Sequence, residues 1–527
     1  MKSSILLRGA QAAMLVLALS GCKDFLDTNT NPNLPLDVPP SVLLTGVQAT
    51  TGFAVGNDLG RVTGLLAQHM AGIANQPRTY DAYQLRGNYD NQWNNELYGG
   101  ALINAQQIIN RTQESSPVYA GYAKILKAYN FALLTDLWGD VPYSEALQGN
   151  LAAPISQPRF DKQEDIYKGN AGMGIQSLFD LVREGLADLD KPSVLRPGAD
   201  DLIHKGSSAA SIIKWKKFGN TMLLKLANTV SKKEPALAAA VIREVLAKGP
   251  AAYITDNTDD AEVPFGTAVG NQNPFFAYNY VNRPDDQMLS QRFLDTLNLR
   301  YKDPRLPRFF TTTPTPVQPV AATSTTPAVV GVNTTGVVTP FGTFTGYDNG
   351  STGGAPVRAS RSRYGAYVVG TSGEVPVRLI TNFQRAFILA EAVLTLPGLT
   401  VTGETAQSLF QAGIRASMLK TGLSAGDVAA YFTANPRLVT LDASRSLEYQ
   451  RNQIITQKWI AWTGNSYEAY NDFRRTGYPK LALVTNPSSE SLTSIPVRLF
   501  YPNSEISANP KIPNPQPNTN VKVWWAQ

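Results

Sequence analysis

The chain of 527 residues contains a single cysteine, Cys22, and this limits how its fold can be stabilised. No disulfide can form within one copy of the chain, so the packing of apolar side chains must supply the stability. Hydrophobic residues make up 43% of the sequence and charged residues only 17%, which is enough apolar material for a large core and argues against disorder. We therefore expect a globular body held together by its core.

The first 21 residues have the order of a secretory signal peptide. Lys2 and Arg8 precede an apolar run at residues 12–19, which the small residues Ser20 and Gly21 close. This run is much shorter than the roughly 20 apolar residues of a membrane-spanning helix. Residues 1–21 are therefore predicted to direct export of the chain.

The segment that ends the signal, Leu19-Ser-Gly-Cys22, resembles the lipobox of bacterial lipoproteins. The resemblance implies cleavage before Cys22 and acylation of that cysteine by fatty acids such as palmitate. At about 0.8 kcal/mol per buried methylene, two or three acyl chains would anchor the protein almost permanently. The alternative is an ordinary signal peptide followed by an incidental cysteine. Residues 22–40 are rich in Asn and Pro and are predicted to form a tether that spans at most roughly 60 Å.

Apolar residues recur at helical spacing along much of residues 41–527, which we expect to form one body. We predict a helix that begins after Ser41 as N-cap, and another after Gly464, where Asn465 and Glu468 have the spacing of a capping box. The other predicted helices are 59–74, 101–109, 122–137, 162–189, 211–231, 235–247, a helix up to residue 299, 381–396, 405–420 and 444–462. This succession with short connectors predicts a mostly α fold of stacked helical hairpins, although the 34-residue tetratricopeptide consensus is absent.

Residues 311–357 differ from this pattern because they consist largely of Thr, Pro, Val, Gly and Ser. Such a composition does not support a helix and has little apolar surface to bury. It predicts either a long exposed loop or a small insertion that contains strands.

An aromatic segment at residues 76–98 is the candidate ligand site. Rings alternate there with amide and guanidinium groups, a combination that suits a sugar or a peptide because rings stack on apolar faces and polar groups fix orientation. The alternative for each ring is amphipathic packing between a helix and a loop. The predicted ligand-binding residues are Tyr83, Arg86, Tyr89, Trp93 and Asn95.

Charge and motifs argue against several other functions. The net charge of +6 falls to +4 once residues 1–21 are removed, because they carry two basic residues and no acidic one. The remaining Lys and Arg are scattered, which argues against a nucleic-acid groove. His69 and His204 lie far apart in the sequence, so a zinc site or a histidine-based triad is not expected. Nucleophile-elbow, phosphate-loop and dinucleotide motifs are absent.

Three polar groups allow either a structural or a functional interpretation. The carboxylates of Asp136, Asp140 and Glu145 form a possible acidic cluster, but their neighbours Gly139 and Pro142 favour turn and capping bonds. Residues 256–262 carry oxygens for a calcium ion, yet their spacing is not that of an EF-hand and a solvated loop is preferred. The pair Arg474-Arg475 suits either an anion or a helix C-terminus, and we favour the latter.

Several blocks resemble the SusD/RagB family of nutrient-binding outer-membrane lipoproteins. One of them is Tyr467-Glu-Ala-Tyr-Asn-Asp-Phe-Arg-Arg-Thr-Gly-Tyr-Pro. The blocks stand in the order that the family has, and together they span nearly the whole chain after residue 21. The others are 22–33, 134–147, 283–290, 458–461, 498–505 and the pair Trp524-Trp525, whereas the resemblance fades in residues 311–357.

The resemblance implies a SusD-like superhelix of tetratricopeptide-like hairpins, lipid-anchored in the outer membrane and facing the cell exterior. It implies a protein that captures oligosaccharides or peptides and delivers them to a SusC-type TonB-dependent transporter without catalysis. From the residues themselves we expect no metal site and no cofactor. Lys23-Asp24 resembles part of a surface-export signal, although Phe25 stands where a second acid is usual.

Two other functions stay open. A surface glycoside hydrolase needs only two carboxylates that are brought together from distant parts of the chain, and it predicts release of reducing ends. A helical-repeat scaffold without a small ligand predicts a bound barrel partner but no response to glycans or peptides.

Overall fold

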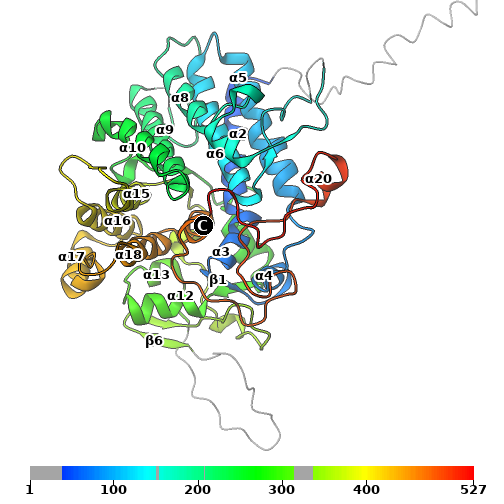
Figure 1. Cartoon of the computed structure of the whole chain (residues 1–527). Helices are drawn as coiled ribbons and strands as arrows, with labels where there is room; N and C mark the ends of the chain where they lie inside the picture. Colours follow the sequence, from blue (N-terminus) through cyan, green and yellow to red (C-terminus); the bar gives the residue numbers. More distant parts are fainter. Residues whose placement is uncertain (1–37, 150–152, 207, 314–335, 527) are drawn as a thin grey trace, which may run out of the picture.

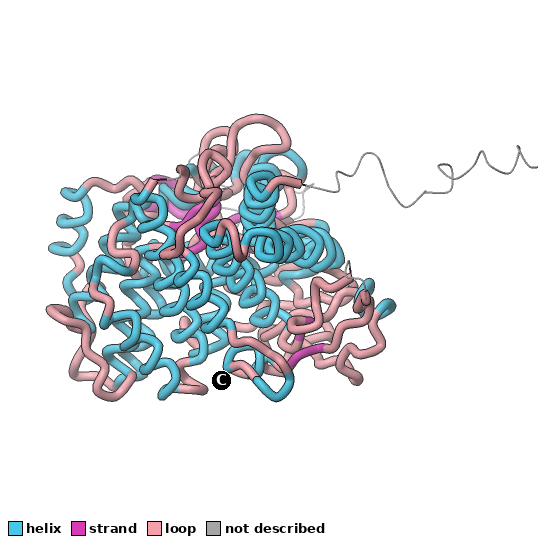
Figure 2. Tube along the Cα trace, turned by 90° about the horizontal axis from the view of Figure 1, so that it is seen from above, coloured by secondary structure: helices cyan, strands magenta, loops and turns pink. Residues whose placement is uncertain are grey.

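The computed structural model describes residues 38–149, 153–206, 208–313 and 336–526. The predicted signal peptide, the predicted lipidation site Cys22 and most of the predicted tether lie outside the described residues. Helices dominate the described part, which confirms the predicted mostly α fold, and the strands are short and few (Figures 1 and 2).

The helices of the first half follow one another with short connectors (Figure 1). They are α2 (Pro40–Gly56), α3 (Asp58–Leu66), α4 (Asn75–Asp81), the π-helix η1 (Gln92–Leu102), α5 (Ile103–Thr112), α6 (Pro117–Trp138), α7 (Gln163–Lys168), α8 (Leu178–Asp188), α9 (Ala209–Val230) and α10 (Pro235–Ala247). Sequence neighbours pack as pairs, α5 on α6, α8 on α9 and α9 on α10, as the predicted stacked hairpins require.

The second half adds short helices around the strands and then a group of longer ones. The short elements are α11 (Pro274–Phe276), η5 (Ala277–Asn282), α12 (Gln291–Asp295), η6 (Thr296–Arg300), α13 (Leu306–Phe309) and α14 (Ala366–Val369). The longer ones are α15 (Asn382–Thr395), α16 (Ala406–Lys420), α17 (Ala425–Ala434), α18 (Leu447–Ala461) and α19 (Ser466–Thr476), followed by the short α20 (Asn503–Ala508). Helix α15 packs on both α16 and α18.

Helix α6 is the most deeply buried long helix of the first half, and every residue of it except Lys127 is buried. It ends at Gly139 as predicted, because that residue has φ +89°, which favours glycine. Gly121 lets α8 approach closely, since a Cβ placed there would lie 2.7 Å from the carbonyl oxygen of Gly185. Two glycines that face each other thus set the distance between α6 and α8.

The structure corrects several predicted helix boundaries. Ser41 lies inside α2, which begins at Pro40, and Asn465 precedes α19 without a side-chain capping bond. The predicted helix 59–74 ends at residue 66, and the chain continues into strand β1 because Gln68 adopts φ +58°. The predicted helix 162–189 is divided into α7 and α8, where Gly169 at φ +81° stops the first and Ser177 caps the second.

The strands form four two-stranded antiparallel sheets within the described residues. β1 (Met70–Gly72) pairs with β5 (Gln287–Leu289), and Ala71 lies opposite Met288. The other pairs are β2 (Val141–Pro142) with β3 (Phe160–Asp161), β4 (Ala261–Val263) with β8 (Val377–Ile380), and β6 (Val337–Thr339) with β7 (Gly342–Phe344). The β1–β5 and β4–β8 pairs join distant parts of the chain, whereas β6–β7 is a local hairpin.

The described part of the predicted insertion contains the β6–β7 hairpin, in line with a strand-bearing insertion. It is not wholly exposed, because Phe344, Tyr347 and Asn349 are buried. Asn349 donates to Asp81 at 2.6 Å and to the carbonyl of Met70 at 2.8 Å, which ties this segment to α4 and β1.

The last fifty residues run back over the first helices (Figure 1). Their contacts with the N-terminal half include four hydrogen bonds: Val484 N to Tyr83 Oη at 3.2 Å, Leu85 N to Glu490 at 2.8 Å, Trp93 Nε1 to Glu505 at 3.2 Å, and Trp525 Nε1 to Asp136 at 2.9 Å. The N-terminal loops therefore receive part of their support from the opposite end of the chain. No helix in the described ranges combines the length and the apolarity that crossing a membrane requires.

Candidate functional site

The aromatic segment runs from α4 through a loop into η1, but three of its five predicted ligand residues are buried. Tyr83, Tyr89 and Trp93 are only 1%, 3% and 1% exposed. The Tyr89 ring stacks on Tyr80 with centroids 5.7 Å apart, and Trp93 meets the edge of Trp138 at 5.3 Å. In this structure the three rings pack in the core, and they have no free face on which a ligand could stack.

The other two predicted residues, Arg86 and Asn95, are exposed. The Arg86 guanidinium lies over the Phe500 ring, 4.0 Å from its centroid, so its orientation is fixed by an aromatic support. Asn95 donates to the Asn91 side chain at 3.0 Å, one helical turn away on η1.

Further amides surround these two residues, and we call the set Arg86, Asn88, Asn91, Asn94, Asn95 and Asn503 the amide face. Asn94 donates to Ser504 at 2.8 Å, and Asn88 donates to the Arg86 carbonyl at 3.1 Å. A Cβ on Gly87 would lie 3.6 Å from the Asn503 side chain. The amide face is thus shared by the aromatic segment and α20. The predicted ligand residues did not include Asn88, Asn91, Asn94 and Asn503. The four-residue spacing of Asn91 and Asn95 would have indicated that these two side chains share one helix face.

The backbone beneath the amide face is strained. Tyr83 and Tyr89 have φ of +64° and +76°, a conformation that is costly for aromatic residues. The next element, η1, is an 11-residue π-helix, a form that is rare and frequent at functional sites. Burial holds the strained residues in place and raises the pKa of the Tyr89 phenol well above its usual value. The buried rings anchor the loop in the core, as a preformed binding surface would require.

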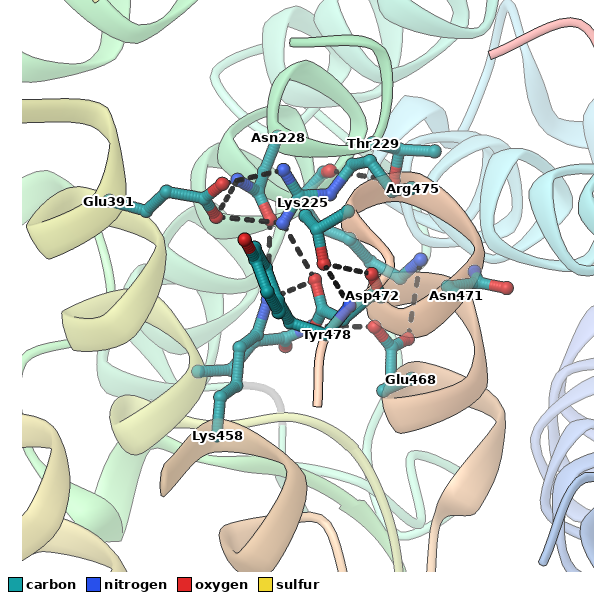
Figure 3. Close-up of polar contacts among 12 residues, drawn as sticks. Lys225, Asn228, Thr229, Glu391, Lys458, Glu468, Asn471, Asp472, Arg475 and Tyr478 are labelled. Carbon is teal, nitrogen blue, oxygen red and sulfur yellow. Dashed lines mark hydrogen bonds and ion pairs between the residues drawn. The ribbon is translucent and has the colours of Figure 1, made fainter. Parts of the chain in front are cut away.

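The resembling block at residues 467–479 contributes to a buried charged cluster (Figure 3). It joins α9, α15, α18 and α19 through Lys225, Glu391, Lys458, Glu468, Asp472 and Arg475. Arg475 donates to both oxygens of Glu391 at 2.7 Å and to Asp472 at 2.8 Å. Burial alone would raise the pKa of Glu391, but the nearby cations Arg475, Lys458 and Arg451 lower it to about 2.

The charged cluster has no room for a ligand. The cavity that it encloses has a volume of about 10 Å³, which is about the space of one water molecule. Glu468, the predicted capping-box residue, lies 3.2 Å from Lys225 and accepts from Gln384 at 2.8 Å. The cluster therefore acts as a structural junction between four helices.

Arg474 lies in the last turn of α19, as predicted, and its side chain also makes internal contacts. It donates to the carbonyls of Asp136 and Val497 and lies over the rings of Tyr470 and Trp525. Burial lowers the pKa of this guanidinium below its usual value. Both arginines of the pair are thus structural, and neither grips an external anion.

Asp136, Asp140 and Glu145 do not form a catalytic group. Asp136 accepts from Tyr167, Tyr467, Asn471 and Trp525 at 2.6 to 2.9 Å. Asp140 accepts from the backbone of Gln163 at 3.1 Å, and Glu145 accepts from that of Arg159 at 2.8 Å. These are the structural bonds that the neighbouring turn favoured.

The possible calcium loop is engaged in internal bonds. Asp256 caps Thr258, Asp259 pairs with Lys217 at 2.6 Å, and Asp260 pairs with Lys420 at 2.9 Å. His69 is buried against Ser466, and burial lowers its pKa to about 3. In the described ranges no three His, Cys, Asp or Glu side chains gather as metal ligands would.

A groove between α5, α6 and α8 contains two neighbouring cavities of about 360 and 590 Å³. Both are lined by Gln106, Lys127 and Gln176. Burial lowers the pKa of Lys127 to about 8, and its ammonium donates to Gln106 at 2.6 Å. Sequence reasoning did not single out this groove, because isolated polar residues on a helix normally face water.

Comparisons with known proteins cover most of the chain. Residues 32–502 match the family model described as starch-binding proteins associating with the outer membrane, SusD-like. No protein of curated function matches the sequence.

Solved structures with the same fold include a chitin-binding protein that is 25% identical, with a TM-score of 0.71 over 93% of this chain and 100% of the other. A chitin-binding SusD homologue from Flavobacterium johnsoniae is 22% identical, with a TM-score of 0.70 over 92% and 98%. A SusD/RagB family protein from Bacteroides thetaiotaomicron is 21% identical, with a TM-score of 0.69 over 93% and 99%.

Proposed function

The chain belongs to the SusD-like family of starch-binding proteins associated with the outer membrane, and from this premise we propose that it is a non-catalytic receptor for oligosaccharides. It captures them at the cell surface and delivers them to a SusC-type TonB-dependent transporter. Lipidation of Cys22, export to the outer face and the delivery step belong to this proposal. The family match over residues 32–502 is the observation that carries it.

We assign the ligand contacts to the amide face. Arg86 and Asn95 present donors and acceptors to solvent, as sugar hydroxyl groups require. Tyr83, Tyr89 and Trp93 support this face from below, because they are buried directly beneath its backbone. A preformed face reduces the entropy lost on binding, so few contacts suffice for useful affinity.

Calorimetric titration of residues 23–527 with maltoheptaose and chitohexaose tests the proposal. The first probe follows from the family description and the second from the chitin-binding protein of similar structure. We expect binding of at least one glycan, with affinity lowered about tenfold or more by Arg86→Ala combined with Asn95→Ala. Lys522→Gln, an exposed substitution elsewhere, is the control and should bind as wild type.

The same samples distinguish the other functions. Release of reducing ends over hours would contradict the receptor proposal and indicate a glycoside hydrolase. Absence of any heat or melting-temperature response to a broad glycan and peptide panel, together with capture of a barrel protein, would favour the scaffold. Labelling with a palmitate analogue, abolished by Cys22→Ser, tests the anchor separately.

A further inference from the structure

A further pocket lies between η6, α18 and the loop that follows α19. Its volume is about 330 Å³, at the lower end of the range for small-molecule sites. The residues that line it are Gln68, Arg292, Thr296, Arg300, Asn452, Thr456, Trp459, Pro479, Lys480, Leu481 and Ala482. Three of these side chains are cationic and none is acidic, so the pocket is strongly biased in charge.

Arg292 is a fixed wall of the pocket. It donates to Asp348 at 2.9 Å and to the Ala482 carbonyl at 2.8 Å. Gln68 donates to the same carbonyl, which fastens the loop after α19 onto the body. One cation of the pocket therefore already has an acidic partner.

Arg300 and Lys480 have no acidic partner within the described ranges of the chain. Arg300 lies 5.4 Å from the centre of the Tyr301 ring, and Lys480 lies 4.5 Å from that of Tyr478. Both side chains are exposed, so each can turn its charged end toward a ligand. Two unpaired cations at one concave site attract an anion, and a concave wall of protein strengthens that attraction.

The remaining lining groups suit a sugar. The Thr296 hydroxyl donates to the Arg292 carbonyl at 2.9 Å, and the buried Thr456 hydroxyl donates to the Asn452 side chain at 3.1 Å. The Thr296 oxygen and the Asn452 amide N–H groups can still bond a ligand. The buried Trp459, wedged against Phe293 at 4.6 Å, gives the pocket a firm wall. A sugar ring that carries both a carboxylate and hydroxyl groups can bond the cations and the polar side chains of the pocket at the same time.

We propose that this pocket, the cationic pocket, binds the carboxylate of a uronic acid residue in an acidic oligosaccharide. Arg300 and Lys480 hold the carboxylate, and the Thr296 and Asn452 side chains meet the ring hydroxyls. The glycan part of this inference rests on the proposed function, whereas the anion preference rests on the pocket alone. The cationic pocket shares no lining residue with the amide face.

Titration of residues 23–527 with trigalacturonate, with maltotriose as the uncharged probe of similar length, tests the inference. We expect trigalacturonate to bind, and its affinity to fall at least tenfold in Arg300→Gln combined with Lys480→Gln. Raising the salt from 0.05 to 0.5 M should weaken the same binding severalfold, since exposed charges are screened. The control Arg437→Gln combined with Lys522→Gln removes two exposed cations elsewhere and should change nothing.

The outcomes separate this inference from the proposed function. Loss of trigalacturonate binding in the pocket variant, with neutral glycan binding intact, supports a distinct anion site. If the protein binds trigalacturonate but no neutral glycan, the anion-binding inference is supported, whereas the proposed function as a receptor for neutral sugars is contradicted. Absence of trigalacturonate binding, equal loss in the control, or equal binding of free acetate and the trisaccharide would overturn the inference.

Discussion

Replacing Arg475 by Met tests how much the charged cluster contributes to stability. The guanidinium is buried and bonds both oxygens of Glu391 at 2.7 Å. Its removal leaves the carboxylate with Asn228 at 3.1 Å and the Arg451 Nε at 3.4 Å. Breaking a buried ion pair from one side typically costs about 3 to 5 kcal/mol. Because partial partners remain, we expect about 3 kcal/mol.

The pKa of Glu391 gives an independent magnitude. A pKa lowered from 4.5 to about 2 corresponds to about 3 kcal/mol of preferential stabilisation of the charged form. This stabilisation is fully present above pH 4.5, where the unfolded carboxyl is ionised, and is lost as the pH falls toward 2. The difference between wild type and Arg475→Met should therefore be largest at neutral pH and shrink between pH 4.5 and 2.

Thermal unfolding followed by circular dichroism measures this difference. With an unfolding entropy of about 2 cal/mol/K per residue, a body of roughly 490 residues loses about 1 °C for each kcal/mol, so we expect a fall of about 3 °C at pH 7. Arg437→Met, at an exposed position, is the matched control. Glu391→Gln added to Arg475→Met should restore part of the loss, because the lone buried charge is then gone. A fall below about 0.5 °C, or an equal fall at pH 3 and pH 7, would refute the reasoning.

Three further substitutions test the region around the amide face. Trp93→Ala should cost about 3 to 5 kcal/mol, seen as a lower Tm, because it empties a core position; an unchanged Tm with lost glycan binding would instead make the ring a ligand contact. Gly72→Ala should destabilise the protein by about 1 to 3 kcal/mol in the same unfolding assay, since the new Cβ would lie 2.0 Å from the Pro77 carbonyl oxygen. Its control is Gly149→Ala, which should be neutral because the space around Gly149 is open. Arg86→Ala should cost at most about 1 kcal/mol of stability, through the lost contact with Phe500, but should weaken glycan binding in calorimetry; a Tm loss like that of Trp93→Ala would contradict its surface role.

The helices with local signals could be predicted from sequence. Helix α6 ends at Gly139 because glycine readily adopts the positive φ found there, and α10 begins at Pro235 because proline restricts φ to a helical value. The predicted helix 59–74 was wrong after residue 66, since the segment that follows pairs with β5, more than 200 residues away. Such a partner leaves no trace in a local apolar pattern.

The candidate site could be predicted only in outline. The segment and its exposed members Arg86 and Asn95 followed from composition. The burial of Trp93 did not, because its cover comes from Trp138 and Tyr501, which lie far along the chain. Amphipathic rings look the same in sequence whether they meet a ligand or a neighbouring helix.

The dependence of the N-terminal loops on the last fifty residues has a consequence for biosynthesis. Residues 83–93 emerge from the ribosome early, yet their partners at 484–505 are made almost last. A nascent or prematurely terminated polypeptide therefore lacks the supports that shape this region. If the proposed function holds, glycan binding should arise only in complete chains, and a product of incomplete translation or of proteolysis before residue 478 should not bind glycans.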